Sequence, residues 1–395
     1  MLRNRTLAAV VTARFISLIG TNMTLVALPW FVLSTTGSTA KMGLVLACQT
    51  IPAVVLGVPG GDVVARIGPR RALVLGDALR APLLAAVPAL SWLGVLSFPL
   101  LIVLVTVIGV FSVPYAAASN AILPEIVGED ESEIARATAA LQVAIQTTGV
   151  VGPILAGVLI PLVGAPSILL FDAASYALSA AIVALFVHAG RALARRGHRR
   201  GVLVGVRQVR RDPLLASIVA AALAAHVGLA ALFATLPALA FRSFHDARTA
   251  GVLFAADAVG SVLGGFLALG LARRVRPMRL GVIGFALMAG PIWILTGATS
   301  LPLAVAAMVL FGVGGPLGVS PISATLTTRA PAAIRPQVVS AFLAITAAGT
   351  PLGAAGAGLA IERIGFAATM TLATLLLWGF VRRTRGAPEP APEPA

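Results

Sequence analysis

Residues 188–212, HAGRALARRGHRRGVLVGVRQVRRD, are the longest polar segment inside a chain that is otherwise strongly apolar. The segment carries eight arginines, and long apolar runs separated by short polar loops lie on both sides of it. Roughly 20 apolar residues in a helix that rises 1.5 Å per residue cross ~30 Å of hydrocarbon. The segment therefore divides the chain into two sets of predicted membrane spans.

Six spans are predicted before this segment and six after it. We expect a six-helix bundle over residues 1–188, a basic cytoplasmic linker over 189–212, a second bundle over 213–381 and a disordered tail over 382–395. The expected spans cover residues 6–33, 42–64, 72–93, 100–122, 137–159, 167–187, 214–241, 250–272, 280–296, 303–325, 338–361 and 367–381.

The arginines predict how these spans are oriented. If the N-terminus is cytoplasmic, 23 of the 29 Lys and Arg residues fall on the cytoplasmic side. Positive charge is retained in the cytoplasm during membrane insertion, so both termini are predicted to be cytoplasmic. The residues that fall on the outer side are Lys41, Arg242, Arg248 and Arg363, and those inside spans are Arg14 and Arg80.

The composition excludes several classes of protein. A chain that is 58% hydrophobic and 11% charged, with mean hydropathy +0.99, does not fit a water-soluble core and shell. The net charge of +15 lies mostly in the loops between spans, so no nucleic-acid partner is expected. The single cysteine, Cys48, excludes a disulfide framework, and we expect neither a metal nor a cofactor.

The two halves resemble each other weakly. A Gly-Gly pair followed by arginines occurs at 60–61 and again at 264–265. The segment GPILAG at 152–157 is echoed by TPLGAA at 350–355. Two six-span repeats around a central binding site are typical of secondary transporters.

The loop between the second and third spans, residues 61–71, reads GDVVARIGPRR. It is similar to the G-x-x-x-D-R-x-G-R-R loop of the major facilitator superfamily, and the chain resembles the drug and siderophore exporters within that family. Ala65 replaces an acid that normally helps to lock one conformational state, and Asp62 is the candidate substitute. The gating residues that the resemblance implies are Gly61, Arg66, Gly68, Arg70 and Arg71.

Three further segments carry the resemblance. Asp77 and Arg80 in the third span lie three residues apart on one helix face, and we interpret them as a structural pair, with proton movement as the alternative. Asp172 in the sixth span is expected to be a packing or capping residue. The segment GVVGPILAG resembles the antiporter motif of the fifth span, and its close-packing and bending residues are Gly149, Gly152, Pro153 and Gly157.

Ionisable residues within spans are the candidates for energy coupling. No Walker loop is present, so a gradient is the expected energy source, and protons are the usual coupling ion of this family. Burial in a membrane is costly for such residues, which makes each one a functional candidate. Asp257 and His226 are predicted at similar depths, where they would exchange a proton. Asp62 and Asp77 complete the proton-coupling candidates.

The resemblance implies a central cavity lined mainly by spans 1, 4, 7 and 10. The polar residues expected there are mostly neutral, which suits amphipathic molecules better than sugars or highly charged metabolites. Two glutamines on the fifth span share a face that is expected to reach the same space. The cavity candidates are Arg14, Asn22, Thr24, Tyr115, Asn120, Gln142, Gln146, Ser320 and Ser323.

The sequence thus predicts a proton-coupled exporter of amphipathic drug-like compounds or secreted metabolites, working by alternating access. We expect a monomer in the inner membrane of a bacterium. A facilitator or importer of a small nutrient is an open alternative, as is a membrane enzyme or a sensor on the same fold. No H-E-x-x-H or G-x-S-x-G motif is present, so enzymatic activity is not predicted.

Overall fold

The computed structural model describes residues 5–128, 130–187, 199–271, 274–275, 277–296, 300–329 and 334–385, and these contain helices and no strand. The first half contains α1 (Arg5–Thr36), α2 (Thr39–Ile67), α3 (Pro69–Trp92), α4 (Phe98–Val127), α5 (Glu131–Val163) and α6 (Ala165–Phe186). The remainder contains α7 (Arg199–Arg211), α8 (Pro213–Leu239), the π-helical turn η1 (Ala240–Phe244), α9 (Ala247–Leu271), α10 (Pro277–Thr296), α11 (Leu301–Arg329), α12 (Arg335–Ala347) and α13 (Gly349–Arg385).

Ten helices in the described residues are long and apolar enough to cross a membrane, and Arg279–Leu295 is a shorter apolar helix. α13 is interrupted at Gly365, which has a φ of 83° and is not helical. The last two expected spans, 338–361 and 367–381, lie on opposite sides of this break. The full set of twelve spans and the orientation of the termini stay predictions.

The helices end where the sequence supplies turns. Gly68 has a φ of 85°, which favours glycine, and Pro69 then begins α3. Asp130 caps α5, with its Oδ1 atom accepting a 2.8 Å hydrogen bond from the backbone N–H of Ser132. Hydrogen bonds from Ser132 and the backbone hold the pKa of Asp130 below its ordinary value.

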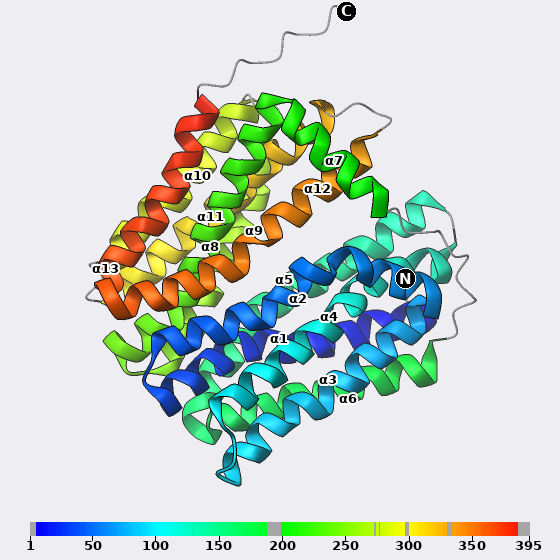
Figure 1. Cartoon of the computed structure of the whole chain (residues 1–395), viewed down its shortest axis with the longest axis vertical. Coiled ribbons are helices and arrows are strands. Elements are labelled where there is room, and N and C mark those ends of the chain that lie inside the picture. Colours follow the sequence, from blue (N-terminus) through cyan, green and yellow to red (C-terminus); the bar gives the residue numbers. More distant parts are fainter. Residues whose placement is uncertain are drawn as a thin grey trace, which may run out of the picture.

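The helices form two groups that meet mainly along two helix pairs (Figure 1). α1–α4 and α6 gather in the lower part of the view, and α8–α13 gather above them. The extensive contacts between the halves are those of α5 with α9 and of α2 with α13, and α1 and α2 make smaller contacts with α8, α9 and α12. A Cβ atom added to Gly43 of α2 would lie 2.9 Å from the Cα of Gly358 of α13, so glycine allows these two backbones to approach closely.

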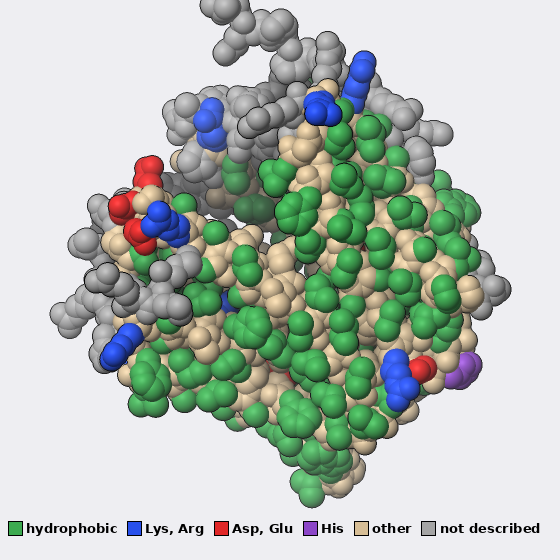
Figure 2. All heavy atoms as spheres, turned by 180° about the vertical axis from the view of Figure 1, so that it is seen from behind, with side chains coloured by type: hydrophobic (Ala, Val, Ile, Leu, Met, Phe, Trp, Pro, Cys, Tyr) green, Lys and Arg blue, Asp and Glu red, His purple; other side chains and the backbone are tan. Residues whose placement is uncertain are grey.

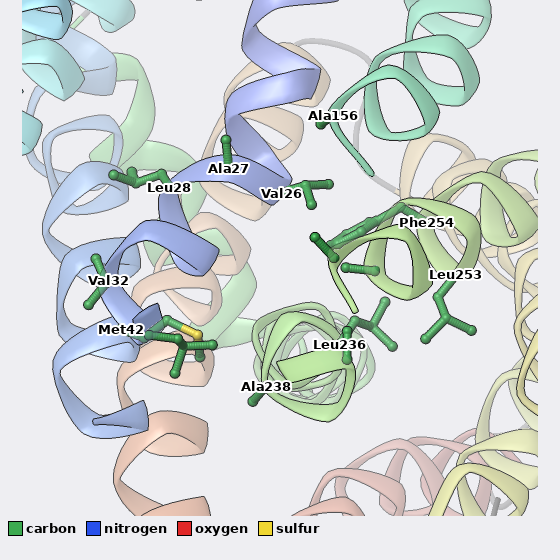
Figure 3. Close-up of a cluster of buried hydrophobic side chains, with 14 of the residues drawn as sticks. Val26, Ala27, Leu28, Val32, Met42, Ala156, Leu236, Ala238, Leu253 and Phe254 are labelled. Atoms are coloured by element: carbon green, nitrogen blue, oxygen red, sulfur yellow. The ribbon is translucent and has the colours of Figure 1, made fainter. Parts of the chain in front are cut away.

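Apolar side chains fill the junction between the halves. Figure 3 shows Val26 of α1, Ala156 of α5, Leu236 of α8 and Phe254 of α9 in one buried cluster. The outer surface is also apolar: hydrophobic side chains cover most of the face in Figure 2, and charged ones gather toward its periphery. Phe266 keeps 71% of its surface exposed, as expected for a residue that faces lipid.

The basic linker contains a helix that the sequence analysis did not predict. α7 lies beside α12 (Figure 1). Val209 of α7 is buried against Val338 of α12 and against Leu215 and Val219 of α8. Gly205 lets the backbone of α7 approach that of Gln337. The described part of the linker, residues 199–211, therefore packs against the second half.

Candidate functional site

A cavity of about 400 Å³ lies between the two halves, a volume within the usual range for small-molecule sites. Residues from α1, α2 and α5 of the first half line it together with residues from α8, α9 and α13 of the second. The residues that carry its chemistry are Asn22, Gln49, Thr50, Gln146, Phe233, Phe254, Asp257, Ser261 and Thr350.

The lining is apolar with neutral hydrogen-bonding groups and a single carboxylate. Phe233 and Phe254 stack with ring centroids 5.8 Å apart, and Phe311 meets Phe233 edge-on at 6.2 Å. Asp257 is the one ionisable residue among those that line the cavity in the described structure. Among the described lining residues, the site thus offers aromatic faces, one acid and no basic group.

Asp257 lies on α9, directly against α11. The backbone of Gly312 touches the Asp257 carbonyl, and any larger residue at 312 would collide with that carbonyl. Within the described part of the chain, the Asp257 carboxylate has neither an ion-pair partner nor a hydrogen-bond donor. A carboxylate in such a place is available to a proton or to a cationic ligand.

Asn22 and Gln146 line the cavity as expected, and Gly149 and Pro153 of the antiporter-like segment join them. Asn22 donates a 3.3 Å hydrogen bond to the hydroxyl of Thr148 on α5. A Cβ atom on Gly152 would lie 2.5 Å from the Cβ of Asn22, so the glycine allows α1 and α5 to approach.

Other sequence candidates lie away from this cavity. His226 is not a lining residue: its Nδ1 atom is 2.9 Å from the Ala222 carbonyl, and its Cβ packs against Gly349. The structure therefore does not bring His226 and Asp257 together in the lining. Asn120 and Gln142 are exposed, and neither lines the cavity.

The expected contribution of the fourth span is also absent, because α4 supplies none of the described lining residues. Its predicted cavity residue, Tyr115, turns into the first half instead. Ser320 and Ser323 lie on α11, but their side chains fall outside the described part of the structure.

Arg14, Thr24 and Tyr115, three predicted cavity residues, belong to a buried polar region inside the first half. There the Arg80 guanidinium forms the expected ion pair with Asp77. Arg80 lies between two aromatic rings, 4.2 Å from the centroid of Tyr115 and 4.3 Å from that of Tyr176. These are the only tyrosines in the chain.

Asp172 joins this region from α6 and is fully buried. Its Oδ2 atom accepts a 2.5 Å hydrogen bond from the Thr24 hydroxyl, and its Oδ1 atom accepts one of 3.2 Å from Ser175. The expectation of a packing or capping residue is thus incomplete, since Asp172 lies well inside α6. The four-residue spacing of Asp172 and Tyr176, which puts both on one helix face, was the available signal.

The loop that follows α2 ties α3 to α6. Arg70 donates hydrogen bonds to the carbonyls of Ala184, at 2.6 Å, and Val187, at 2.5 Å, which satisfies the C-terminal end of α6. Arg66 and Arg71 are exposed, and Asp62 is half-buried on α2. The structure explains the position of Arg70, whereas the gating role of the loop stays a prediction.

The sequence model of the Major Facilitator Superfamily matches residues 10–354 of this chain. The chain belongs to this superfamily. Its relatives include a multidrug efflux pump Tap from Mycolicibacterium fortuitum, 27% identical over 92% of this chain and 91% of the relative. A multidrug efflux pump Tap from Mycobacterium tuberculosis is 25% identical over 89% of this chain and 85% of that protein.

Solved transporters of the superfamily share the fold. The nucleoside transporter NupG superposes with a TM-score of 0.79 at 14% identity, covering 96% of this chain and 97% of NupG. A bacterial homologue of the human lysosomal transporter Spinster, inward-facing and occupied, gives 0.73 at 16% identity, over 97% and 94% of the two chains. The protein is therefore a multi-pass membrane transporter.

Proposed function

We propose that this protein exports amphipathic, drug-like cations in exchange for protons. The observation that carries the proposal is the Asp257 carboxylate, which has no partner among the described residues and lines a cavity between the two halves. A cation held there needs apolar walls for its body and one negative charge for its head. The relatives that are named multidrug efflux pumps support this substrate class.

Asp257 couples cation export to proton entry because its carboxylate binds either a proton or the cation, and not both. A carboxylate in an apolar cavity is favourable when it is either protonated or paired with a cation, and costly when it is bare. When the cavity faces the cytoplasm, the cation displaces the proton; when it faces outward, a proton displaces the cation. The stacked rings of Phe233 and Phe254 provide an apolar, cation-attracting surface beside it.

The gating residues complete this scheme. Helix pairs α5–α9 and α2–α13 close one side of the cavity, and the halves rock about the site as in other two-repeat transporters. The gating role falls to the loop with Gly61, Arg66, Gly68, Arg70 and Arg71, which Arg70 anchors to the end of α6. The transporter works as a monomer in a bacterial inner membrane, with both termini cytoplasmic.

The test uses purified protein in liposomes with an acidic lumen and ethidium as the probe. The wild type is expected to accumulate ethidium in the lumen while the pH gradient lasts. Asp257→Asn removes the charge and should abolish gradient-driven accumulation. Asp246→Asn is the same substitution in the loop before α9, where the Asp246 carboxylate accepts a hydrogen bond from the Arg248 backbone N–H. It should leave ethidium accumulation intact.

Two results would overturn the proposal. Full accumulation by Asp257→Asn would show that Asp257 does not carry the proton. If ethidium moves only down its own concentration gradient, whatever the pH gradient, the protein is a facilitator and not an exchanger.

A further inference from the structure

Five side chains from α3, α4 and α6 form a buried charged group in the first half: Asp77, Arg80, Tyr115, Asp172 and Tyr176, here called the N-terminal cluster. None keeps more than 4% of its surface exposed. The central cavity does not include any of them. A buried charged group that does not touch substrate needs a separate explanation, because burying charge in a membrane protein is costly.

The charges within the cluster do not balance. Two carboxylates, Asp77 and Asp172, share one guanidinium, that of Arg80, which is ion-paired directly with Asp77. Asp172 interacts with Arg80 only at longer range and is held by two hydroxyl groups. Adding one proton to Asp172 makes the buried set neutral, so the cluster is suited to take up and release one proton.

The groups that face Asp172 come from every helix around it. α1 contributes the Thr24 hydroxyl and α3 contributes Arg80, while Thr21 contacts Tyr176 and Asp77 pairs with Arg80. From α6 itself come Ser175 and Tyr176. Further out, Arg14 is half-exposed, lies 4.9 Å from the centroid of the Tyr115 ring, and acts on Asp77 rather than on Asp172.

A second, much smaller cavity adjoins the cluster. It measures about 10 Å³, close to the space that one water molecule needs. Its polar walls are Arg14, Tyr115 and Ser119. Tyr115 therefore adjoins both this cavity and the Arg80 guanidinium. A single water there would place a proton carrier next to the cluster.

α1 separates the cluster from the substrate cavity. Asn22 faces the cavity. Thr24 donates to Asp172, and the Thr21 hydroxyl lies 3.0 Å from that of Tyr176. Gly20 is also pressed against Asp172, where a larger residue would collide. A change in the charge of Asp172 thus acts directly on the helix that forms one wall of the cavity.

We propose that Asp172 is a second proton-binding site, which loads and unloads one proton in each transport cycle and acts on the substrate cavity through Thr24 and α1. This inference rests on the proposed proton-coupled export. It assigns two protons to each exported cation: one displaced at Asp257 by the cation itself, and one carried by the N-terminal cluster.

The first test measures the largest ethidium concentration ratio that a fixed pH gradient can maintain. This ratio gives the number of protons exchanged for each ethidium. Liposomes are clamped at zero voltage with potassium and valinomycin across one pH unit. Each exchanged proton contributes a factor of about ten per pH unit, so wild type should reach roughly 100-fold and Asp172→Asn about tenfold. Asp246→Asn is the matched control and should keep the wild-type ratio.

The outcomes separate the two proposals. If Asp172→Asn sustains the wild-type ratio, the second site is wrong and export through Asp257 stands. If the wild type sustains no gradient-driven accumulation, the proposed function fails, whatever the behaviour of Asp172→Asn.

A spectroscopic test covers the case in which Asp172→Asn does not fold. Infrared difference spectra of the wild type between acidic and alkaline pH should contain the carbonyl band of a buried carboxylic acid from Asp172. Thr24→Val removes the hydroxyl that contacts Asp172 and should move the pH midpoint of that band. Thr106→Val removes a hydroxyl that donates to the Ile102 carbonyl of its own helix, and it should leave the midpoint unchanged. An unmoved midpoint in Thr24→Val would overturn the inference.

Discussion

Gly157 of α5 and Gly251 of α9 meet backbone to backbone across the junction of the two halves. A Cβ atom on Gly157 would lie 3.1 Å from the Cα of Gly251, and one on Gly251 would lie 3.0 Å from the Cα of Gly157. A Cβ atom on Gly251 would also collide with the Pro153 carbonyl oxygen, so the close approach depends on glycine there. The contact joins the antiporter-like segment of α5 to α9, the helix that carries Asp257.

Gly157→Leu should abolish ethidium transport or trap one state while expression is largely retained. The added side chain separates α5 from α9, and overpacking of this kind costs about 1–3 kcal/mol. Transport in liposomes and the melting temperature in detergent measure the two effects. Gly265→Leu is the control, since a Cβ atom at 265 meets nothing within 4 Å. Normal transport by Gly157→Leu would show that the segment at 149–157 only packs helices and has no special part in transport.

Arg80→Lys should lower the melting temperature even though it keeps the positive charge. Lysine loses the planar group that lies between Tyr115 and Tyr176, and the cost should be about 1–3 kcal/mol. Arg136 is the matched control because it also pairs with an acid three residues earlier, Glu133, but at an exposed site. Arg136→Lys should change stability by less than ~0.5 kcal/mol. Equal effects from the two variants would contradict the role of stacking.

Arg70→Ala should destabilise the first half because it removes both hydrogen bonds to the end of α6. Bonds from a charged donor contribute about 1.5–3 kcal/mol each, so the fall in melting temperature should be easily measured. The neighbouring Arg71 is exposed, and Arg71→Ala should have little effect on stability. If gating also depends on this loop, Arg71→Ala will slow transport without lowering the melting temperature.

Cysteine labelling tests the orientation of the chain. In a Cys48→Ala background, cysteines at Ser38 and Ser300 should react from outside intact cells with an impermeant thiol reagent. A cysteine at Gly197, in the basic linker, should react only after the membrane is broken. Labelling of Gly197 in intact cells would reverse the assignment of the cytoplasmic side.

Much of the fold could be predicted because it depends on one-dimensional patterns. Length and hydropathy locate the helices, and small residues at 152–157 indicate close packing. Helix ends were predicted less well: α5 runs from Glu131 to Val163 rather than over 137–159, because a polar first turn capped by Asp130 extends beyond the apolar run. α7 was missed because its apolar residues are few, and Val209 is buried only by tertiary contact with α8 and α12.

The site was harder to predict because depth along a span does not fix the direction in which a side chain points. Asn22 and Thr24 are two residues apart on α1, yet one lines the cavity and the other contacts Asp172. His226 and Asp257 were matched by depth alone, and only Asp257 faces the cavity. The partners of Arg80 on α4 and α6 are set by tertiary packing, which spacing within α3 does not reveal.

Both tyrosines of the chain lie beside Arg80, so they act as intrinsic spectroscopic probes of that region. Any tyrosine-specific signal, such as an ultraviolet resonance Raman band of the phenol ring, arises from that one place in the molecule. Events at Arg80 and Asp172 are therefore observable during turnover in the unmodified chain, without a label and without substituting a residue.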